Sequence, residues 1–161
     1  MNRTVPMLPE FAARLAAPFA VLGIRVAGER LTGIEYLPRR AATLMPQTRF
    51  AVEVCRQIEA YLADPRFQFD LPIALSATAH QCKVWNAIAA IPAGRTRSYS
   101  DIAREIGSAA RAVGNACGAN PVPLVIPCHR VVAKHGLGGF MGSRDGLPLD
   151  IKRWLLRHEG I

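Results

Sequence analysis

The sequence predicts a mixed α/β (α+β) chain in two parts: a small N-terminal unit of strands and one helix, and a mostly helical second unit. Apolar residues alternate with polar or small ones over 20–26 and 31–37, as in half-buried strands. Over 48–63 they recur every four positions, as on one face of a helix. The composition changes around 72–78, and helical patterns dominate afterwards. We therefore predict two domains, 1–75 and 76–161.

The N-terminal elements have clear limits. Residues 28–30 form a predicted turn between the two strands, and Pro38 closes the second strand. The helix presents an apolar face made of Phe50, Val54, Ile58 and Leu62. It ends at Asp64, because the residue before a proline is pushed out of helical geometry. Residues 67–71 then alternate Phe67, Phe69 and Leu71, which predicts another short strand.

Three helices are predicted after the boundary. The first carries an apolar stripe over 84–91 and stops at Pro92-Ala93-Gly94. The second starts after Ser100 as N-cap and ends at Gly107, which suits a left-handed C-terminal position. Ser108 is predicted to cap the third, 109–118, whose core face is Val113, Ala116 and Cys117. Two short helices joined by a tight glycine-containing turn have the outline of a helix-turn-helix.

The third of these helices consists of small residues, and Arg111 is its only long or charged side chain. Small residues let a helix backbone approach another surface closely. That surface is either a neighbouring helix or a DNA backbone, and the charge balance favours DNA.

The C-terminal stretch predicts a hairpin over 130–140, turned at Lys134-His135-Gly136, followed by a glycine-rich loop. A final helix runs from about Pro148 to His158, with proline in its first turn and Gly160 at its end. Its predicted buried face is Ile151, Trp154 and Leu155.

Charge and cysteine content narrow the function classes. A net charge of +8 and a pI near 10.0 attract polyanions such as nucleic acid. The alternative is a basic protein with no such partner. We find no secretory signal and no apolar run long enough to cross a membrane, so we expect a cytoplasmic protein with four reduced thiols. Cys82 with His80 is only a fragment of a metal site, and we expect neither a metal nor another cofactor.

Residues 120–132 carry the strongest chemical signal. Three prolines frame an extended apolar run that ends at Cys128. Pro127 favours a helical turn there, whose N-terminal N–H groups would stabilise a thiolate and lower the pKa of the Cys128 thiol. His129 and Arg130 follow directly, so the cysteine is interpreted as a nucleophile rather than as packing beneath the loop.

The string Ile126-Pro127-Cys128-His129-Arg130-Val131-Val132 resembles the active-site signature of the O6-alkylguanine-DNA alkyltransferases, also called methylated-DNA–protein-cysteine methyltransferases. The resemblance extends from about Val84 to the C-terminus and includes the segments 96–99, 110–114, 120–121 and 152–160. It implies that 76–161 is a winged-helix-like DNA-binding and active-site domain, with 1–75 as a scaffold.

The resemblance also implies a mechanism. Cys128 attacks the alkyl carbon of O6-alkylguanine, and of O4-alkylthymine, in duplex DNA and keeps the group irreversibly, in a single turnover without a cofactor. His129 corresponds to the base that acts through a water, Glu159 to the acid that orients it, and Tyr99 to the donor for the departing guanine. Asn120, with Pro127 and Arg130, corresponds to the residues that shape the active-site loop.

We expect a monomer whose partner is alkylated double-stranded DNA. The resemblance implies that the helix-turn-helix binds in the minor groove and that the damaged base is flipped out of the stack. Arg111 corresponds to the residue that fills the vacated space; a phosphate contact is the alternative. The expected DNA-binding residues are Ser98, Ala110, Arg111, Ala112, Gly114 and Asn115.

Two segments depart from the family pattern. The turn from Gly107 to Arg111 is about two residues short, and the loop 139–146 is longer than usual. Phe140 stands where family members commonly carry a tyrosine; with Met141 and Ser143 it is expected to line the alkyl pocket.

Two other functions fit parts of the sequence. A lesion sensor or winged-helix regulator would bind DNA without chemistry, but sensors of that kind lack the cysteine. A cysteine hydrolase would use Cys128 and His129 but leaves the arginine helix unexplained.

Overall fold

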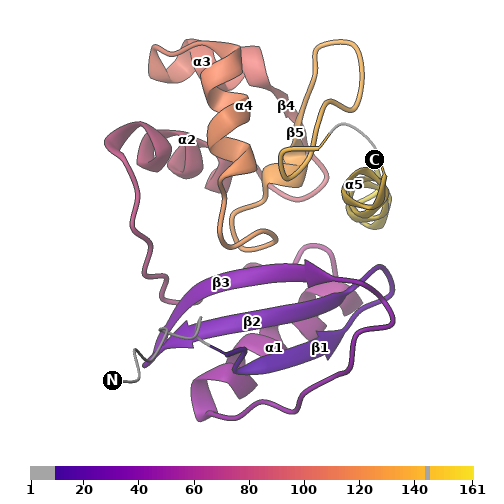
Figure 1. Ribbon diagram of the computed structural model, residues 1–161. Coiled ribbons are helices and arrows are strands. Elements are labelled where there is room, and N and C mark those ends of the chain that lie inside the picture. Colours follow the sequence, from indigo (N-terminus) through magenta and orange to yellow (C-terminus); the bar gives the residue numbers. More distant parts are fainter. Residues whose placement is uncertain (1–9, 144–145) are drawn as a thin grey trace, which may run out of the picture.

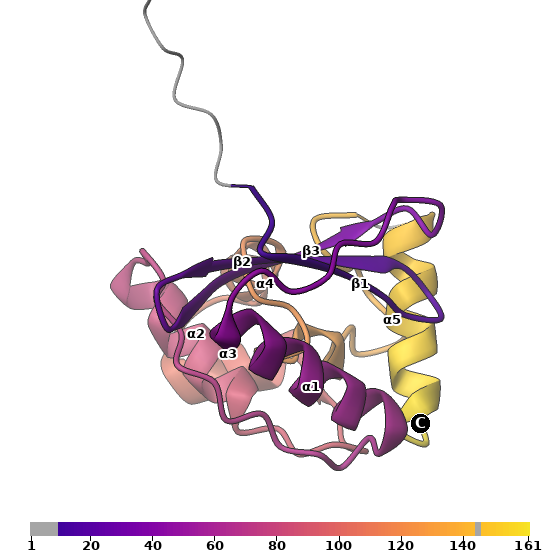
Figure 2. The same ribbon diagram turned by 90° about the horizontal axis from the view of Figure 1, so that it is seen from below.

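A computed structural model describes residues 10–143 and 146–161 (Figure 1). The N-terminal part is an antiparallel sheet of β1 (Ala13–Ala16), β2 (Val21–Ala27) and β3 (Arg30–Leu37), in the order β1-β2-β3. Helix α1 (Arg49–Ala63) lies against one face of this sheet (Figure 2). The mixed α/β class is confirmed, and so are the two predicted strands and the helix. Strand β1 was not predicted.

Local chemistry explains the limits of α1. The Thr48 hydroxyl accepts a hydrogen bond from the backbone N–H of Ala51 at 3.0 Å, which caps the helix N-terminus. Asp64 has an extended backbone and ends the helix before Pro65, as predicted. Val54 and Ile58, from the predicted apolar face, are fully buried.

The strand predicted over 67–71 is wrong. That segment is extended but pairs with no strand, and the sheet contact comes later, where Leu31 donates to the Pro72 carbonyl and accepts from Ala74 N–H. Phe69 packs against the Tyr61 ring at 5.6 Å between centroids. The alternation therefore reflects side chains packed on the core from one side of an extended segment, and does not require a paired strand.

The second part contains the helices α2 (Ala79–Ala89), α3 (Tyr99–Ile106), α4 (Ala110–Gly118) and α5 (Leu147–His158) (Figure 1). All four predicted helices are present. The Trp85 indole N–H donates to the Ala116 carbonyl at 3.0 Å and fixes α2 against α4. None of the helices in the described part of the chain has the length and apolarity that a membrane span requires.

Two predicted caps are wrong. Ser98, and not Ser100, caps α3: its hydroxyl accepts from Asp101 N–H at 3.0 Å, and the Asp101 carboxylate accepts from Ser98 N–H at 3.3 Å. This reciprocal arrangement satisfies two free N–H groups, and the helix therefore starts at Tyr99, two residues earlier than predicted. Ser108 does not cap α4, because its hydroxyl is hydrogen-bonded to His80 Nε2 at 2.8 Å. Gly107 is left-handed, with φ 70°, as predicted.

The hairpin predicted over 130–140 is also wrong. A 3₁₀ turn, η1 (Cys128–Arg130), leads into β5 (Val131–Val132), which pairs in parallel with β4 (Arg97–Ser98). The carbonyls of Val131, Leu137 and Gly139 accept hydrogen bonds from the Lys152 ammonium. Because a side chain occupies these carbonyls, no long pair of strands forms there, and Ala133 and Gly136 make an isolated bridge.

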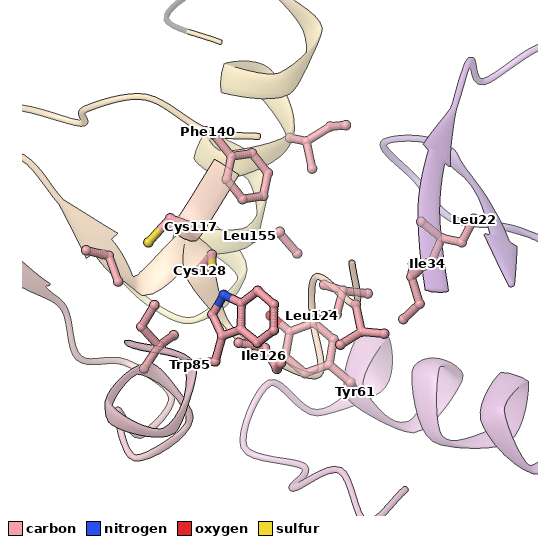
Figure 3. Packing of buried hydrophobic residues seen from close by; sticks show 14 of the residues in the cluster. Leu22, Ile34, Tyr61, Trp85, Cys117, Leu124, Ile126, Cys128, Phe140 and Leu155 are labelled. Atoms are coloured by element: carbon pink, nitrogen blue, oxygen red, sulfur yellow. The ribbon is translucent and has the colours of Figure 1, made fainter. Parts of the chain in front are cut away.

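One continuous hydrophobic core joins the two parts (Figure 3). Leu22 and Ile34 of the sheet belong to the same buried cluster as Leu124, Ile126 and Leu155. A backbone bond from Ile34 N–H to the Pro121 carbonyl, 2.9 Å long, ties β3 to the segment before Cys128. The sheet therefore supports that segment directly, whereas the domain boundary at 75/76 stays a prediction.

The position of the α3 cap gives a stability prediction. We expect Ser98→Ala to lower the free energy of unfolding by about 1 kcal/mol, the usual value of a side-chain N-cap. Ser100→Ala is the matched control and should change it little, because Ser100 is exposed and its hydroxyl caps nothing. Urea unfolding of both variants measures the difference. Equal losses would contradict the assignment of Ser98 as the cap.

Candidate active site

Cys128 lies on the wall of a cavity of about 890 Å³. Only 3% of the residue is exposed. Asn120 holds it from the side, since its Nδ2 donates to Cys128 Sγ at 3.1 Å and to the Ile126 carbonyl at 2.8 Å. Asn120 Oδ1 accepts from Val122 N–H at 3.0 Å. One buried amide thus fixes both the extended segment and the sulfur that ends it.

His129 and Glu159 form a buried pair behind Cys128. His129 Nε2 lies 2.6 Å from Glu159 Oε2, and both residues are buried. The Tyr61 hydroxyl donates to the same oxygen at 2.6 Å, and Arg130 Nε donates to Oε1 at 2.7 Å. Burial alone would raise the pKa of Glu159, but the hydrogen bonds from His129 and Arg130 outweigh it and hold the pKa well below its usual range. Glu159 is therefore a carboxylate.

An ionised Glu159 determines the tautomer of His129. A carboxylate only accepts hydrogen bonds, so the imidazole proton lies on Nε2 and Nδ1 keeps its lone pair. Nδ1 is buried and has no hydrogen-bond partner within the described structure. Burial, partly offset by Glu159, lowers the pKa of His129, so the ring is neutral at physiological pH. The residue that follows Cys128 is thus a neutral imidazole with a free lone pair on Nδ1.

The prediction of a lowered Cys128 pKa is wrong for this arrangement. The neighbouring Cys117 thiol and burial both raise the pKa of Cys128 well above its ordinary value. Cys128 in turn lowers the pKa of Cys117. The 3₁₀ turn at Cys128 has only three residues, and Cys128 N–H already donates to the Ile126 carbonyl. Its dipole is too short to offset the burial of the sulfur, so Cys128 is a thiol at rest.

Lys152 is a buried cation that the sequence did not reveal. It is 0% exposed, and its ammonium donates to the carbonyls of Val131, Leu137 and Gly139 at 2.7–2.8 Å. Burial lowers its pKa to about 8. A lysine in the first half of an amphipathic helix usually points to solvent, and nothing in the sequence pattern places this one inside.

Helices α3 and α4 supply one wall of the cavity. Tyr99 and Arg111 both line it, so the short turn before α4 does not separate them. The Tyr99 hydroxyl donates to the Gly139 carbonyl at 3.0 Å, and burial raises its pKa. Arg111 is exposed. Of the other residues predicted to bind DNA, Ala110, Gly114 and Asn115 also line the cavity. Ala112 does not, and Ser98 serves as the cap of α3.

The loop 138–143 supplies the opposite wall. Phe140, Met141 and Ser143, the residues predicted for the alkyl pocket, all line it. Gly138 is left-handed, with φ 73°, and a Cβ atom there would lie 2.9 Å from the Tyr99 ring, so only glycine fits. Arg144 and Asp145 of the same loop lie outside the described residues.

Tyr36 is a second residue that sequence analysis missed. It comes from β3, and its ring lies 6.2 Å from that of Phe140. Its hydroxyl is buried without a hydrogen-bond partner among the described residues. Tyr36 thus brings a polar group from the N-terminal sheet to the back of the cavity wall. No group of three or more potential metal-ligating side chains occurs among residues 10–143 and 146–161.

Known proteins share both the sequence and the architecture. The family described as "6-O-methylguanine DNA methyltransferase, DNA binding domain" matches residues 79–161. A methylated-DNA–protein-cysteine methyltransferase of Methanosarcina acetivorans is 45% identical over 114 residues, which cover 69% of this chain and 70% of the relative. The crystal structure of the Mycobacterium tuberculosis O6-methylguanine methyltransferase superimposes with a TM-score of 0.78 at 35% identity, over 93% of this chain and 92% of the other. The Mycobacterium tuberculosis protein in complex with DNA gives 0.75 at 37%, over 91% and 90%.

The buried carboxylate gives a prediction about stability and pH. Glu159→Gln should lower the free energy of unfolding at pH 7 by roughly 3–5 kcal/mol, because it leaves Arg130 without its counter-charge. The folded pKa lies below the unfolded value of about 4.3. The carboxylate therefore stabilises the protein fully above the unfolded pKa. This contribution is lost as the pH falls from there through the lower pKa of the folded state.

Urea unfolding at pH 7 and at successively lower pH measures this effect. The difference between parent and variant should shrink towards acid. Glu105→Gln, which removes an exposed partner of Arg97, is the control and should have little effect. A difference that does not depend on pH would contradict the role of an ionised Glu159.

Proposed function

Because the chain belongs to the 6-O-methylguanine DNA methyltransferase family, we propose that it repairs alkylated DNA by moving an alkyl group from guanine O6 onto its own Cys128. The observation that carries this proposal is the Cys128 sulfur on the wall of a cavity, with a neutral His129 and an ionised Glu159 behind it. A nucleophile, a base and an orienting acid in series are what a displacement by sulfur needs.

The chemical step starts from the protonated thiol. His129 Nδ1 accepts the Cys128 proton through a water, and the imidazolium that forms is stabilised by Glu159 at 2.6 Å. The sulfur then forms a bond to the alkyl carbon while the bond from that carbon to guanine O6 breaks. The electron pair leaves with guanine. The product is a thioether, which is chemically inert, so each molecule acts once.

In the proposed reaction, Tyr99 assists the departure of guanine. Its hydroxyl lies on the cavity wall and donates to a loop carbonyl, and its raised pKa means that it keeps its proton at neutral pH. With a base in the cavity, this hydroxyl can turn its hydrogen bond to the ring of the leaving guanine. Lys152 holds the Leu137 and Gly139 carbonyls in place beside it.

The DNA-binding side of the proposal rests on α4. Its small residues Ala110 and Gly114 line the cavity opening together with exposed Arg111. A helix with such a surface can enter the minor groove closely, and the arginine can fill the space left by a flipped base. The net charge of +8 favours binding to the phosphate backbone.

The cavity wall bears on substrate choice. Phe140 supplies an apolar surface without a hydroxyl, and it is held by the Tyr36 ring behind it. We propose that guanine O6-alkyl groups are the principal substrates and that O4-alkylthymine is also accepted, since a cavity of about 890 Å³ has room for either base.

Transfer to Cys128 is tested with a duplex containing O6-methylguanine. We expect one methyl group on Cys128, detected in the peptide 112–130 by mass spectrometry and stoichiometric with the repaired guanine. Cys128→Ala should abolish transfer and keep most of the DNA affinity. Tight binding with an unmodified Cys128 would favour a lesion sensor, and repeated turnover of a small ester or amide would favour a cysteine hydrolase. Either result would overturn the proposal.

The role of Arg111 is tested separately. Arg111→Ala should slow single-turnover transfer from duplex DNA, because the flipped state loses the side chain that occupies the stack. Arg153→Ala, which removes the same charge from an exposed position on α5, is the matched control. Both variants should lose affinity as salt rises. Equal transfer rates for Arg111→Ala and the control would contradict the assignment.

A further inference from the structure

A second thiol lies beside Cys128 in the cavity. Cys117 belongs to the last turns of α4, and both residues line the same cavity while remaining largely buried. Figure 3 shows the two sulfur atoms as neighbours, on different elements of the second part of the chain. All four cysteines are free thiols, but Cys55 on α1 and Cys82 on α2 do not line this cavity.

The two thiols line one cavity as neighbours, and each influences the proton of the other. Each thiol shifts the pKa of the other, that of Cys117 downwards and that of Cys128 upwards, and the Lys152 ammonium lowers both. The proposed alkyl transfer uses one of these thiols and gives no role to the other. Two neighbouring reduced thiols, near a cation and on the wall of a cavity of about 890 Å³, are also accessible to a small oxidant.

We propose that Cys117 and Cys128 are an oxidisable dithiol, which a hydroperoxide converts into a disulfide that blocks the nucleophile reversibly. The inference goes beyond the proposed repair function and does not depend on it, because it concerns the two sulfurs alone. Its consequence is protective: the sulfur of Cys128 is stored as a reducible bond instead of passing to sulfinic acid, which reductants do not restore.

The reaction balances in two steps. A thiolate of the pair attacks one oxygen of the hydroperoxide, the O–O bond breaks, and the leaving alkoxide or hydroxide takes up a proton. The result is a sulfenic acid. The other sulfur then attacks it, the S–S bond forms, the S–O bond breaks, and the hydroxide leaves as water. In total the two thiols lose two electrons and two hydrogens to the peroxide. The same disulfide results whichever sulfur reacts first.

The position of both sulfurs on one cavity wall favours the second step, because the attacking thiol is already beside the sulfenic acid. A disulfide of about 2 Å forms when the two side chains turn towards each other. Asn120, which donates to Cys128 Sγ at 3.1 Å, would lose that acceptor but keep the Ile126 carbonyl.

The sequence provides a direct readout. Trypsin cuts after Arg111 and Arg130 and releases both thiols in one peptide, 112–130. The full-length protein is treated with hydrogen peroxide, and the remaining thiols are blocked with iodoacetamide. The mass of the tryptic peptide is then measured by mass spectrometry. We expect a mass lower by two hydrogen atoms, with neither thiol blocked. After a further cleavage behind Leu124, the two fragments should stay linked until a reductant is added.

Activity and variants complete the test. Peroxide should reduce methyl transfer to background, and dithiothreitol should restore it in the parent and in Cys82→Ser, whose thiol is exposed and outside the cavity. In Cys117→Ser, dithiothreitol should restore none of the activity that this variant had before peroxide treatment. If the serine variant does not fold, Cys117→Ala takes its place. Cys128 should then carry two added oxygens.

Three results would overturn the inference. One is a parent peptide that gains oxygen on Cys128 without losing hydrogen. Another is equal recovery with and without Cys117, and the third is a disulfide between two molecules through Cys82. The mass measurement needs no DNA, so a chain that failed to transfer methyl groups would still reveal whether the two thiols form a disulfide.

Discussion

A single buried carboxylate organises the site. Glu159 accepts hydrogen bonds from Tyr61 of α1, from His129 and Arg130 of the active-site turn and, at 3.4 Å, from the backbone N–H of Gly94. These groups come from segments far apart in the sequence, and all of them converge on the negative charge of this residue. Because Glu159 stays ionised, the proton of His129 is held on Nε2 and its Nδ1 keeps a free lone pair. The orientation of the base, the position of the turn and the contact with the N-terminal part thus share one origin.

The sequence predicted the parts of the site that lie within continuous motifs. Cys128, His129 and Asn120 belong to one short segment whose prolines and polar residues determine its shape, and the structure places them together. Tyr99 and Arg111, from other segments, line the cavity, and Glu159 contacts His129; their roles stay predictions. The predictions that proved wrong concern properties that depend on contacts between residues far apart in the sequence. The pKa of Cys128 is set by the neighbouring thiol of Cys117 on α4 and by burial, and no local pattern reports either.

Contacts between distant residues also explain why some elements of the fold were predicted wrongly. The predicted hairpin after Arg130 is missing because Lys152, from the final helix, occupies the carbonyls that a second strand would need. The segment 67–71 alternates like a strand because its aromatic side chains pack inward, yet no strand pairs with its backbone. Ser98 replaces Ser100 as a cap because Asp101 completes a reciprocal pair with it. In contrast, β2, β3 and α1 have strong periodicity of their own, and the sequence was sufficient to predict them.

The edges of the small sheet have a consequence for association between molecules. Arg14 of β1 exchanges backbone hydrogen bonds with Leu44, and β3 is engaged by Pro72, Ala74 and Pro121. A strand with unoccupied backbone groups is a template onto which another chain can add. Here, loops of the same molecule take those places at both margins. The segments that supply these bonds, among them the one that leads to Cys128, leave fewer backbone groups of the three-stranded sheet open to strand addition by another molecule.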